Sequence, residues 1–168
     1  MTKRVQGPSL PWVLSALAVA ACSGGETRVP QAQSLSDESI QGEVTDFLSQ
    51  YRAALDALDT AAVRELYISD DRFVWVEDGA VRYQSADAIL AGLMGMPQGM
   101  DISTEFADLV VAAIPPTGAS LRTSFHTSIT GEQGGFEFWG MITMVLERQA
   151  AGWRIVSGHT STARERGG

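Results

Sequence analysis

The longest strand-like stretch of the chain runs from Phe136 to Thr162, and a short polar break divides it. Both parts are rich in β-branched and aromatic residues, which predicts two long strands joined by a tight connection at residues 147–152. Residues 136–146 are apolar at both alternating sets of positions. Because a strand with one face in water alternates apolar with polar residues, we expect this strand to be covered on both sides. Helices would cover one side, and a second sheet or a partner subunit the other.

Helical periodicity dominates the segment before the first strand. Apolar residues recur at spacings of three and four over residues 37–58, and Ser36 is a suitable N-cap. These residues form one stripe that consists of Ile40, Val44, Phe47, Tyr51, Leu55 and Leu58. A short second helix is expected over residues 61–67, and a third, capped by Ser85, over residues 86–95.

Six apolar segments are typical of strands. They cover residues 73–76, 81–83, 102–114, 119–130, 136–146 and 153–162. The first two flank Asp78-Gly79, a dipeptide favoured in two-residue hairpin turns. Two helices, a hairpin, a third helix and four long strands predict an α+β fold. We expect the four long strands to curl around the helices and to leave a conical cavity between them.

The first 22 residues have the pattern of a bacterial export signal. Lys3 and Arg4 precede an apolar segment that is too short to span a bilayer. The small residues before Cys22 resemble a lipobox, which implies that Cys22 becomes the lipidated first residue of a mature lipoprotein. An ordinary secretory signal cleaved near Ala21 is the alternative. Ser23 favours the outer membrane, in a cell that has one.

Four segments follow from this pattern. We expect a lipoprotein signal peptide over residues 1–21, a flexible tether over 22–35, a folded domain over 36–163 and a polar tail over 164–168. The tether is polar and contains glycine and proline, as flexible linkers do. A lipid at Cys22 would hold the domain at the membrane surface of the cell envelope.

Composition restricts the classes of partner. The chain of 168 residues has a formal net charge of −8, which makes nucleic acid a poor partner. A neutral or cationic small molecule, or a protein, suits this charge better. The chain has one cysteine and two histidines, His126 and His159, without metal-ligand spacing. We therefore expect neither a metal nor a cofactor.

Motifs at both ends of the expected domain resemble those of a known superfamily. The segments Gln50–Asp59, Leu66-Tyr67, Asp70-Asp71 and Val76-Glu77-Asp78 resemble the opening of the nuclear transport factor 2-like superfamily, and residues 152–161 resemble its closing strand. The superfamily includes ketosteroid isomerases and SnoaL-like polyketide cyclases. The resemblance covers residues 38–162 and implies three N-terminal helices packed on a curved, mostly antiparallel sheet. Because this scaffold carries enzymes, binding modules and dimerisation domains, it implies no single function.

The resemblance also implies roles for particular residues. Ketosteroid isomerases use an aspartate as general base and a tyrosine with a protonated aspartate as oxyanion donors. Tyr51 corresponds to the tyrosine, and Asp78 corresponds roughly to the base. The third position falls near Thr143, which is not an acid, so this sequence departs from the isomerase pattern.

Each candidate site residue has two interpretations. Tyr51 is a hydrogen-bond donor in the cavity or a core tyrosine, and Asp78 is a general base or a turn residue. His159 shares its alternation with Trp153 and Ile155, and is a proton shuttle or a histidine at a strand end. The remaining candidates are residues that line the cavity or fill a dry core: Thr127, Trp139, Met141 and Thr143.

Two other groups of residues bear on the expected cavity. Met94, Met96 and Met100 flank its mouth, where flexible thioethers adapt to a ligand, or belong to an ordinary surface loop. His126 is expected to face away from the cavity, and Glu77 to be a solvated loop carboxylate.

Three hypotheses remain open from the sequence. The first is a lipid-anchored SnoaL-like domain that binds a small, largely apolar molecule in its cavity. The second is a homodimeric interaction module without a ligand, in which Phe125, Trp139 and Met141 fill that space. The third is an acid–base isomerase, cyclase or hydratase with Asp78 or His159 as base. The first two share the expectation of a homodimer.

Overall fold

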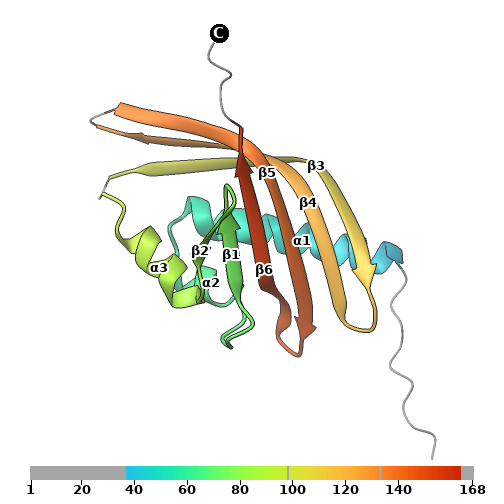
Figure 1. Ribbon diagram of the computed structural model, residues 1–168. Coiled ribbons are helices and arrows are strands. Elements are labelled where there is room, and N and C mark those ends of the chain that lie inside the picture. The colour runs from blue at the N-terminus through green and yellow to red at the C-terminus, as the bar shows by residue number, and fades with distance from the viewer. Residues whose placement is uncertain (1–36, 98, 133, 164–168) are drawn as a thin grey trace, which may run out of the picture. The chain divides into compact units, whose positions relative to one another are not determined.

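The computed structural model describes residues 37–97, 99–132 and 134–163 (Figure 1). The signal peptide, the lipidation of Cys22, the tether and the polar tail therefore lie outside the described residues and stay predictions. None of the helices in the described ranges is long and apolar enough to cross a membrane.

Three helices precede or interrupt the strands, in the order expected. The elements are α1 (Asp37–Asp56), α2 (Thr60–Arg64), β1 (Val74–Glu77), β2 (Ala80–Tyr83), α3 (Ala86–Met94), β3 (Asp101–Ile114), β4 (Gly118–Gly131), β5 (Gly134–Gln149) and β6 (Gly152–Thr162). Helix α1 ends slightly before its predicted end, where Leu58 has a φ of 51° and leaves the helical conformation. Helix α2 is shorter than predicted because Tyr67 forms a parallel bridge to Ile155 of β6.

The six strands form one sheet in the order β2-β1-β6-β5-β4-β3. Strands β1 and β6 pair in parallel, and the other neighbours are antiparallel. The hairpin of β1 and β2 therefore extends the edge of the long meander. This arrangement confirms the predicted α+β fold with helices packed on a curved, mostly antiparallel sheet.

Helix α1 lies along the concave side of the sheet, and α3 lies near the β1–β2 hairpin (Figure 1). The apolar stripe of α1 faces the strands: Ile40, Val44, Phe47, Leu48, Tyr51 and Ala54 are buried. Opposite them, the inward residues of the strands include Leu121, Phe125, Ile142 and Met144, all buried. Burial of this apolar surface between helix and sheet is the main stabilising contribution to the fold.

Register irregularities in β2, β3 and β6 decide which side chains face inward, and those in β2 and β6 involve candidate site residues. In β2, Trp75 is opposite Tyr83 and Val76 is opposite Val81, so Arg82 is an extra residue in the pairing. In β6, Leu146 pairs with Ile155 and Val145 pairs with Ser157, which leaves Val156 as the extra residue. An extra residue reverses the alternation of all positions beyond it.

One face of the long meander has no cover within the described residues. Trp139, Met141 and Val145 of β5 are exposed large apolar side chains on this face. A second sheet was one of the two covers expected for this face. In the described part of the chain all the strands belong to a single sheet, so no second sheet covers it. Coverage by a partner subunit stays a prediction.

Candidate functional site

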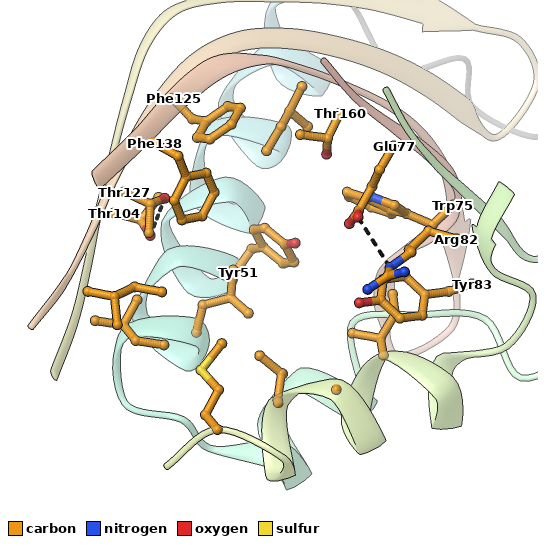
Figure 2. Close-up of a pocket in the computed structure, with 18 of the residues that line it drawn as sticks. Tyr51, Trp75, Glu77, Arg82, Tyr83, Thr104, Phe125, Thr127, Phe138 and Thr160 are labelled. Carbon is orange, nitrogen blue, oxygen red and sulfur yellow. Dashed lines mark hydrogen bonds and ion pairs between the residues drawn. The ribbon is translucent and has the colours of Figure 1, made fainter. Parts of the chain in front are cut away.

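A cavity of about 370 Å³ lies between α1, α3, the β1–β2 hairpin and the concave face of the sheet (Figure 2). Pockets for small molecules have volumes of about 300–1,000 Å³, so this cavity suits a small ligand. Most of its lining is aromatic or aliphatic: Tyr51, Leu55, Tyr67, Trp75, Tyr83, Ile89, Leu93, Met96, Ile102, Phe106, Phe125, Ile129, Phe138 and Ile142. Its polar lining side chains are Tyr51, Tyr67, Tyr83, Glu77, Arg82, Thr104, Thr127 and Thr160.

Two tyrosine hydroxyl groups meet beside the cavity. The Oη atoms of Tyr51 and Tyr67 lie 3.2 Å apart, and both side chains are buried. Burial, assisted by the negative charge of Glu77, raises the pKa of Tyr51 to about 12 against the opposing effect of the Tyr67 hydrogen bond. Burial also raises the pKa of Tyr67 well above its usual range. Both phenols are therefore protonated near neutral pH. One proton joins the two oxygens, and the other is available to a ligand.

Glu77 and Arg82 form the charged end of the cavity. Glu77 ends β1 and shares its inward face with Trp75, since strand residues two apart lie on one face. The bulge in β2 lets both Arg82 and its neighbour Tyr83 contribute to the lining. Arg82 Nε lies 3.6 Å from Glu77 Oε2, and Figure 2 shows the two side chains directed toward one another beside Trp75 and Tyr83. Burial raises the pKa of Glu77; the charge of Arg82 opposes this shift, and Asp78 adds to it.

The expectation that Glu77 is a solvated loop carboxylate is therefore wrong, because it is a strand residue that lines the cavity. The alternation of Trp75 and Glu77 along β1 is the sequence signal that could have found it. If Asp78-Gly79 forms the turn, Glu77 is the last residue of the strand. It then lies on the same face as the buried indole of Trp75.

The structure places Asp78 in the hairpin turn and outside the cavity lining. Asp78 and Gly79 have φ values of 48° and 87°, as a two-residue turn of the Asp-Gly type requires. Its Oδ1 accepts a hydrogen bond from the backbone N–H of Thr162 at 2.8 Å. The carboxylate therefore ties the hairpin to the end of β6, which supports the turn interpretation and leaves it poorly placed to act as a base in the cavity.

His159 is exposed on the outer face of the sheet, and its neighbour Thr160 lines the cavity instead. The expected alignment of His159 with Trp153 and Ile155 is wrong because the bulge at Val156 reverses the alternation between them. A proton shuttle into the cavity from this position would have to cross the sheet.

Three of the four expected lining residues on the long strands also face outward. Trp139, Met141 and Thr143 are exposed and lie outside the lining, so their expected place in the cavity is wrong. The inward positions of β5 are Phe138 and Ile142. Both alternating sets in this strand are apolar, so hydrophobicity alone could not identify the inner face.

Thr127 lies in the cavity lining, as Tyr51 does, and thus where both were expected. Its Oγ1 is 3.2 Å from Oγ1 of Thr104 on β3, a contact also drawn in Figure 2.

His126 faces outward near Glu137, which agrees with its expected direction. Met96 lines the cavity, whereas Met94 is exposed. Within the described ranges, no group of acidic, histidine or cysteine side chains could hold a metal ion.

Comparison with known proteins identifies the family. A family model described as a SnoaL-like domain matches residues 37–159. A nuclear transport factor 2-like superfamily protein from Salmonella enterica is similar in structure, with a TM-score of 0.68 at 16% identity over 79% of this chain and 96% of the other. A candidate dehydratase of the same family from Streptomyces avermitilis has a TM-score of 0.67 at 16% identity, covering 77% of this chain and all of the other.

A third similar structure is a candidate scytalone dehydratase from Novosphingobium aromaticivorans, with a TM-score of 0.67 at 13% identity over 76% of this chain and 86% of that one. At these identities the structures show a common fold alone. No curated protein matches the chain. The matched model spans nearly all of the described domain, and the chain therefore belongs to the family of SnoaL-like domains with the nuclear transport factor 2-like fold.

Proposed function

We propose that the domain binds a small, largely apolar molecule in the cavity between α1, α3 and the sheet. The observation that carries the proposal is the open volume of about 370 Å³, which has apolar walls and a few polar groups. Aromatic and aliphatic side chains make up most of the lining, and the charged groups Glu77 and Arg82 lie on the side of the β1–β2 hairpin, across the cavity from Thr104 and Thr127 (Figure 2). Such a distribution favours a ligand with an apolar body and few polar groups.

The tyrosine pair supplies a donor for one such polar group. Because Tyr51 and Tyr67 share one hydroxyl proton between them, the second can bond to an oxygen or nitrogen of the ligand. A buried donor of this kind contributes more to orientation than to affinity, since leaving it unmatched is costly. We therefore expect ligands with an acceptor to bind better than hydrocarbons of the same size.

The open cavity disfavours the module without a ligand. That hypothesis requires Trp139 and Met141 to fill the space, but both side chains lie on the other face of the sheet. Thermal unfolding of the full chain with a library of small apolar compounds tests the choice. A ligand that binds only the folded state raises the melting temperature by mass action. If no compound raises it at near-millimolar concentration, the binding function is contradicted.

Acid–base catalysis is the second candidate, with Glu77 in the role first considered for Asp78. Burial holds the pKa of Glu77 above its usual range, as a general base near neutral pH requires. Two of the similar structures are named as candidate dehydratases, and elimination of water can begin with the transfer of a proton from carbon to a base. Deuterium exchange at carbon beside a carbonyl of a bound compound, followed by NMR, tests this role. Exchange that persists in Glu77→Gln would contradict it.

The cellular setting is also part of the proposal. Lipidation of Cys22, which lies outside the described residues, would present the domain at the bacterial cell envelope, with the outer membrane favoured. In cells supplied with an alkyne-tagged fatty acid, the wild-type chain should take up label and sediment with membranes. Label or membrane retention that survives Cys22→Ser would contradict the anchor.

We also propose that a second copy of the chain covers the outer face of the meander. This face carries exposed apolar residues of β3 and β5, such as Val110, Trp139 and Met141. It also carries charges of both signs, a positive charge from Arg122 and negative charges from Glu105 and Glu137. A face with both signs can meet its own copy across a two-fold axis with unlike charges opposed.

A further inference from the structure

The charged end of the cavity is an incompletely matched ion pair. Arg82 Nε and Glu77 Oε2 are 3.6 Å apart, which is longer than a hydrogen bond. The Arg82 side chain is 64% exposed, whereas that of Glu77 is 40% exposed. The carboxylate is thus the more enclosed partner, and the guanidinium reaches it from the solvent side. An exposed arginine in a long ion pair is weakly held and can be displaced at little cost.

The contacts of the Arg82 guanidinium indicate that this end of the cavity accepts a cationic group. Its Cζ lies 5.8 Å from the centroid of the Tyr83 ring, within the range of a cation–π contact. The guanidinium therefore touches both a carboxylate and an aromatic face. A cationic group brought in by a ligand would find the same two partners.

Further aromatic rings complete the surroundings of the carboxylate. Trp75 lines the cavity beside Glu77, and its indole packs edge-on against Tyr67 with ring centroids 6.4 Å apart. Tyr67 in turn packs edge-on against Tyr51 at 6.3 Å. Because these rings pack against one another, the aromatic wall of the cavity is preformed in the absence of a ligand. A preformed wall of this kind favours cations, whose charge interacts with the ring faces.

We propose that the charged end of the cavity is a cation subsite, and that the ligand is an apolar molecule with an ammonium group. The ammonium displaces the Arg82 guanidinium and lies between the Glu77 carboxylate and the Tyr83 ring, with Trp75 beside it (Figure 2). The inference rests on the proposed function, since it names the class of molecule that the cavity takes.

The charges of the chain favour a cation over an anion. An anion at Arg82 would lie close to the Glu77 carboxylate and be repelled by it. The field of this carboxylate reaches the middle of the cavity, where it adds to the effect of burial in raising the pKa of Tyr51. The net charge of −8 also raises the local concentration of cations at the protein surface.

Three ligands with one apolar body test the inference: naphthylmethylamine, naphthylmethanol and naphthoate. Their dissociation constants for the full chain are measured by calorimetry near neutral pH. The amine should bind about tenfold more tightly than the alcohol, and naphthoate should bind most weakly. Glu77→Gln should abolish the preference for the amine. Arg82→Gln, which removes the resident cation, should tighten binding of the amine severalfold.

Asp78→Asn is the matched control. It removes a carboxylate one residue away, outside the cavity lining, and an Asn-Gly turn preserves the hairpin. Retention of the preference in this variant would exclude a general effect of net charge.

Equal binding of amine and alcohol, in the wild type and in Glu77→Gln, would overturn the cation subsite and leave the proposed function standing. Tightest binding of naphthoate, lost in Arg82→Gln, would overturn it in favour of an anion site. If none of the three binds, the inference also fails, and the wider compound library decides separately whether the cavity binds ligands at all.

Discussion

Gly158 of β6 leaves the space that the indole of Trp75 occupies. The two residues are paired across β1 and β6, and a Cβ built on Gly158 would overlap the six-membered ring of Trp75. The indole therefore lies flat over the neighbouring strand, where it lines the cavity beside Glu77. A glycine at this position is what allows a large aromatic ring to form part of the wall.

Gly158→Ala should therefore destabilise the fold. The added methyl group must push the buried indole away, and overpacking of this kind costs about 1–3 kcal/mol. Urea unfolding of the full chain, followed by tryptophan fluorescence, measures the change. Gly42→Ala is the matched control, because Gly42 is exposed on α1 with open space around it. That variant should gain about 0.5–1 kcal/mol from helix propensity. Equal effects of the two substitutions would contradict the packing of Trp75 on Gly158.

Glu77→Gln should stabilise the fold at neutral and alkaline pH. Burial raises the pKa of Glu77 in the folded chain above its ordinary value of 4.5, so ionisation costs stability as the pH rises through the folded pKa. The neutral amide avoids this cost. Because the side chain is 40% exposed, the gain should be below about 1 kcal/mol after solvent screening.

The gain from Glu77→Gln should disappear as the pH falls below the ordinary pKa, where the carboxyl is protonated in both states. Thermal unfolding of both proteins from pH 4 to 8 measures this dependence. Arg82→Gln should change stability in the opposite direction at neutral pH, because Arg82 lowers the pKa of Glu77. A gain from Glu77→Gln that is constant with pH would contradict the account.

The hydroxyl groups of Tyr51 and Tyr67 should be energetically coupled. Each substitution to phenylalanine removes the 3.2 Å hydrogen bond and leaves the other hydroxyl without that partner. The double variant should therefore be more stable than the sum of the single changes predicts, by about 0.5–1.5 kcal/mol. A double-mutant cycle in urea measures the coupling. Additive changes would show that the two hydroxyls do not bond in solution.

Trp139→Glu should dissociate the proposed homodimer. The substitution places a charge in the middle of the exposed face of β5, where a second copy is proposed to lie. Sedimentation velocity at micromolar concentration should show a dimer for the wild type and a monomer for the variant. Val81→Glu is the control, because Val81 is an exposed apolar residue on β2, away from the meander. A wild type that sediments as a monomer would contradict the proposed interface.

The sequence predicted the elements well because their signals are local. The stripe through Val44, Phe47 and Tyr51 identifies the buried face of α1, and Asp78-Gly79 identifies the hairpin. The four long strands follow from their length and their β-branched and aromatic residues. The family resemblance then orders these elements into one fold, which the structure confirms.

The sequence could not predict which strand faces line the cavity. The extra residues Arg82 and Val156 arise from pairing between strands, which no local pattern encodes. They direct Arg82 and Tyr83 together into the cavity and direct His159 out of it. In β5 both sets of positions are apolar, so Trp139 could not be distinguished from Phe138 as the inward residue. The site was thus only partly predicted, through Tyr51 and Thr127.

A small molecule bound inside the cone of strands is the central claim, and filling the cavity tests it most directly. Thr160→Phe adds a ring to an inward position of β6, and His159→Phe adds the same ring to the adjacent outward position. The measurement is the dissociation constant of the best compound from the library, for the wild type and both variants. Thr160→Phe should weaken binding at least tenfold, and His159→Phe should change it little. Equal affinity in all three proteins would contradict the claim, because the compound would then bind somewhere other than the cavity.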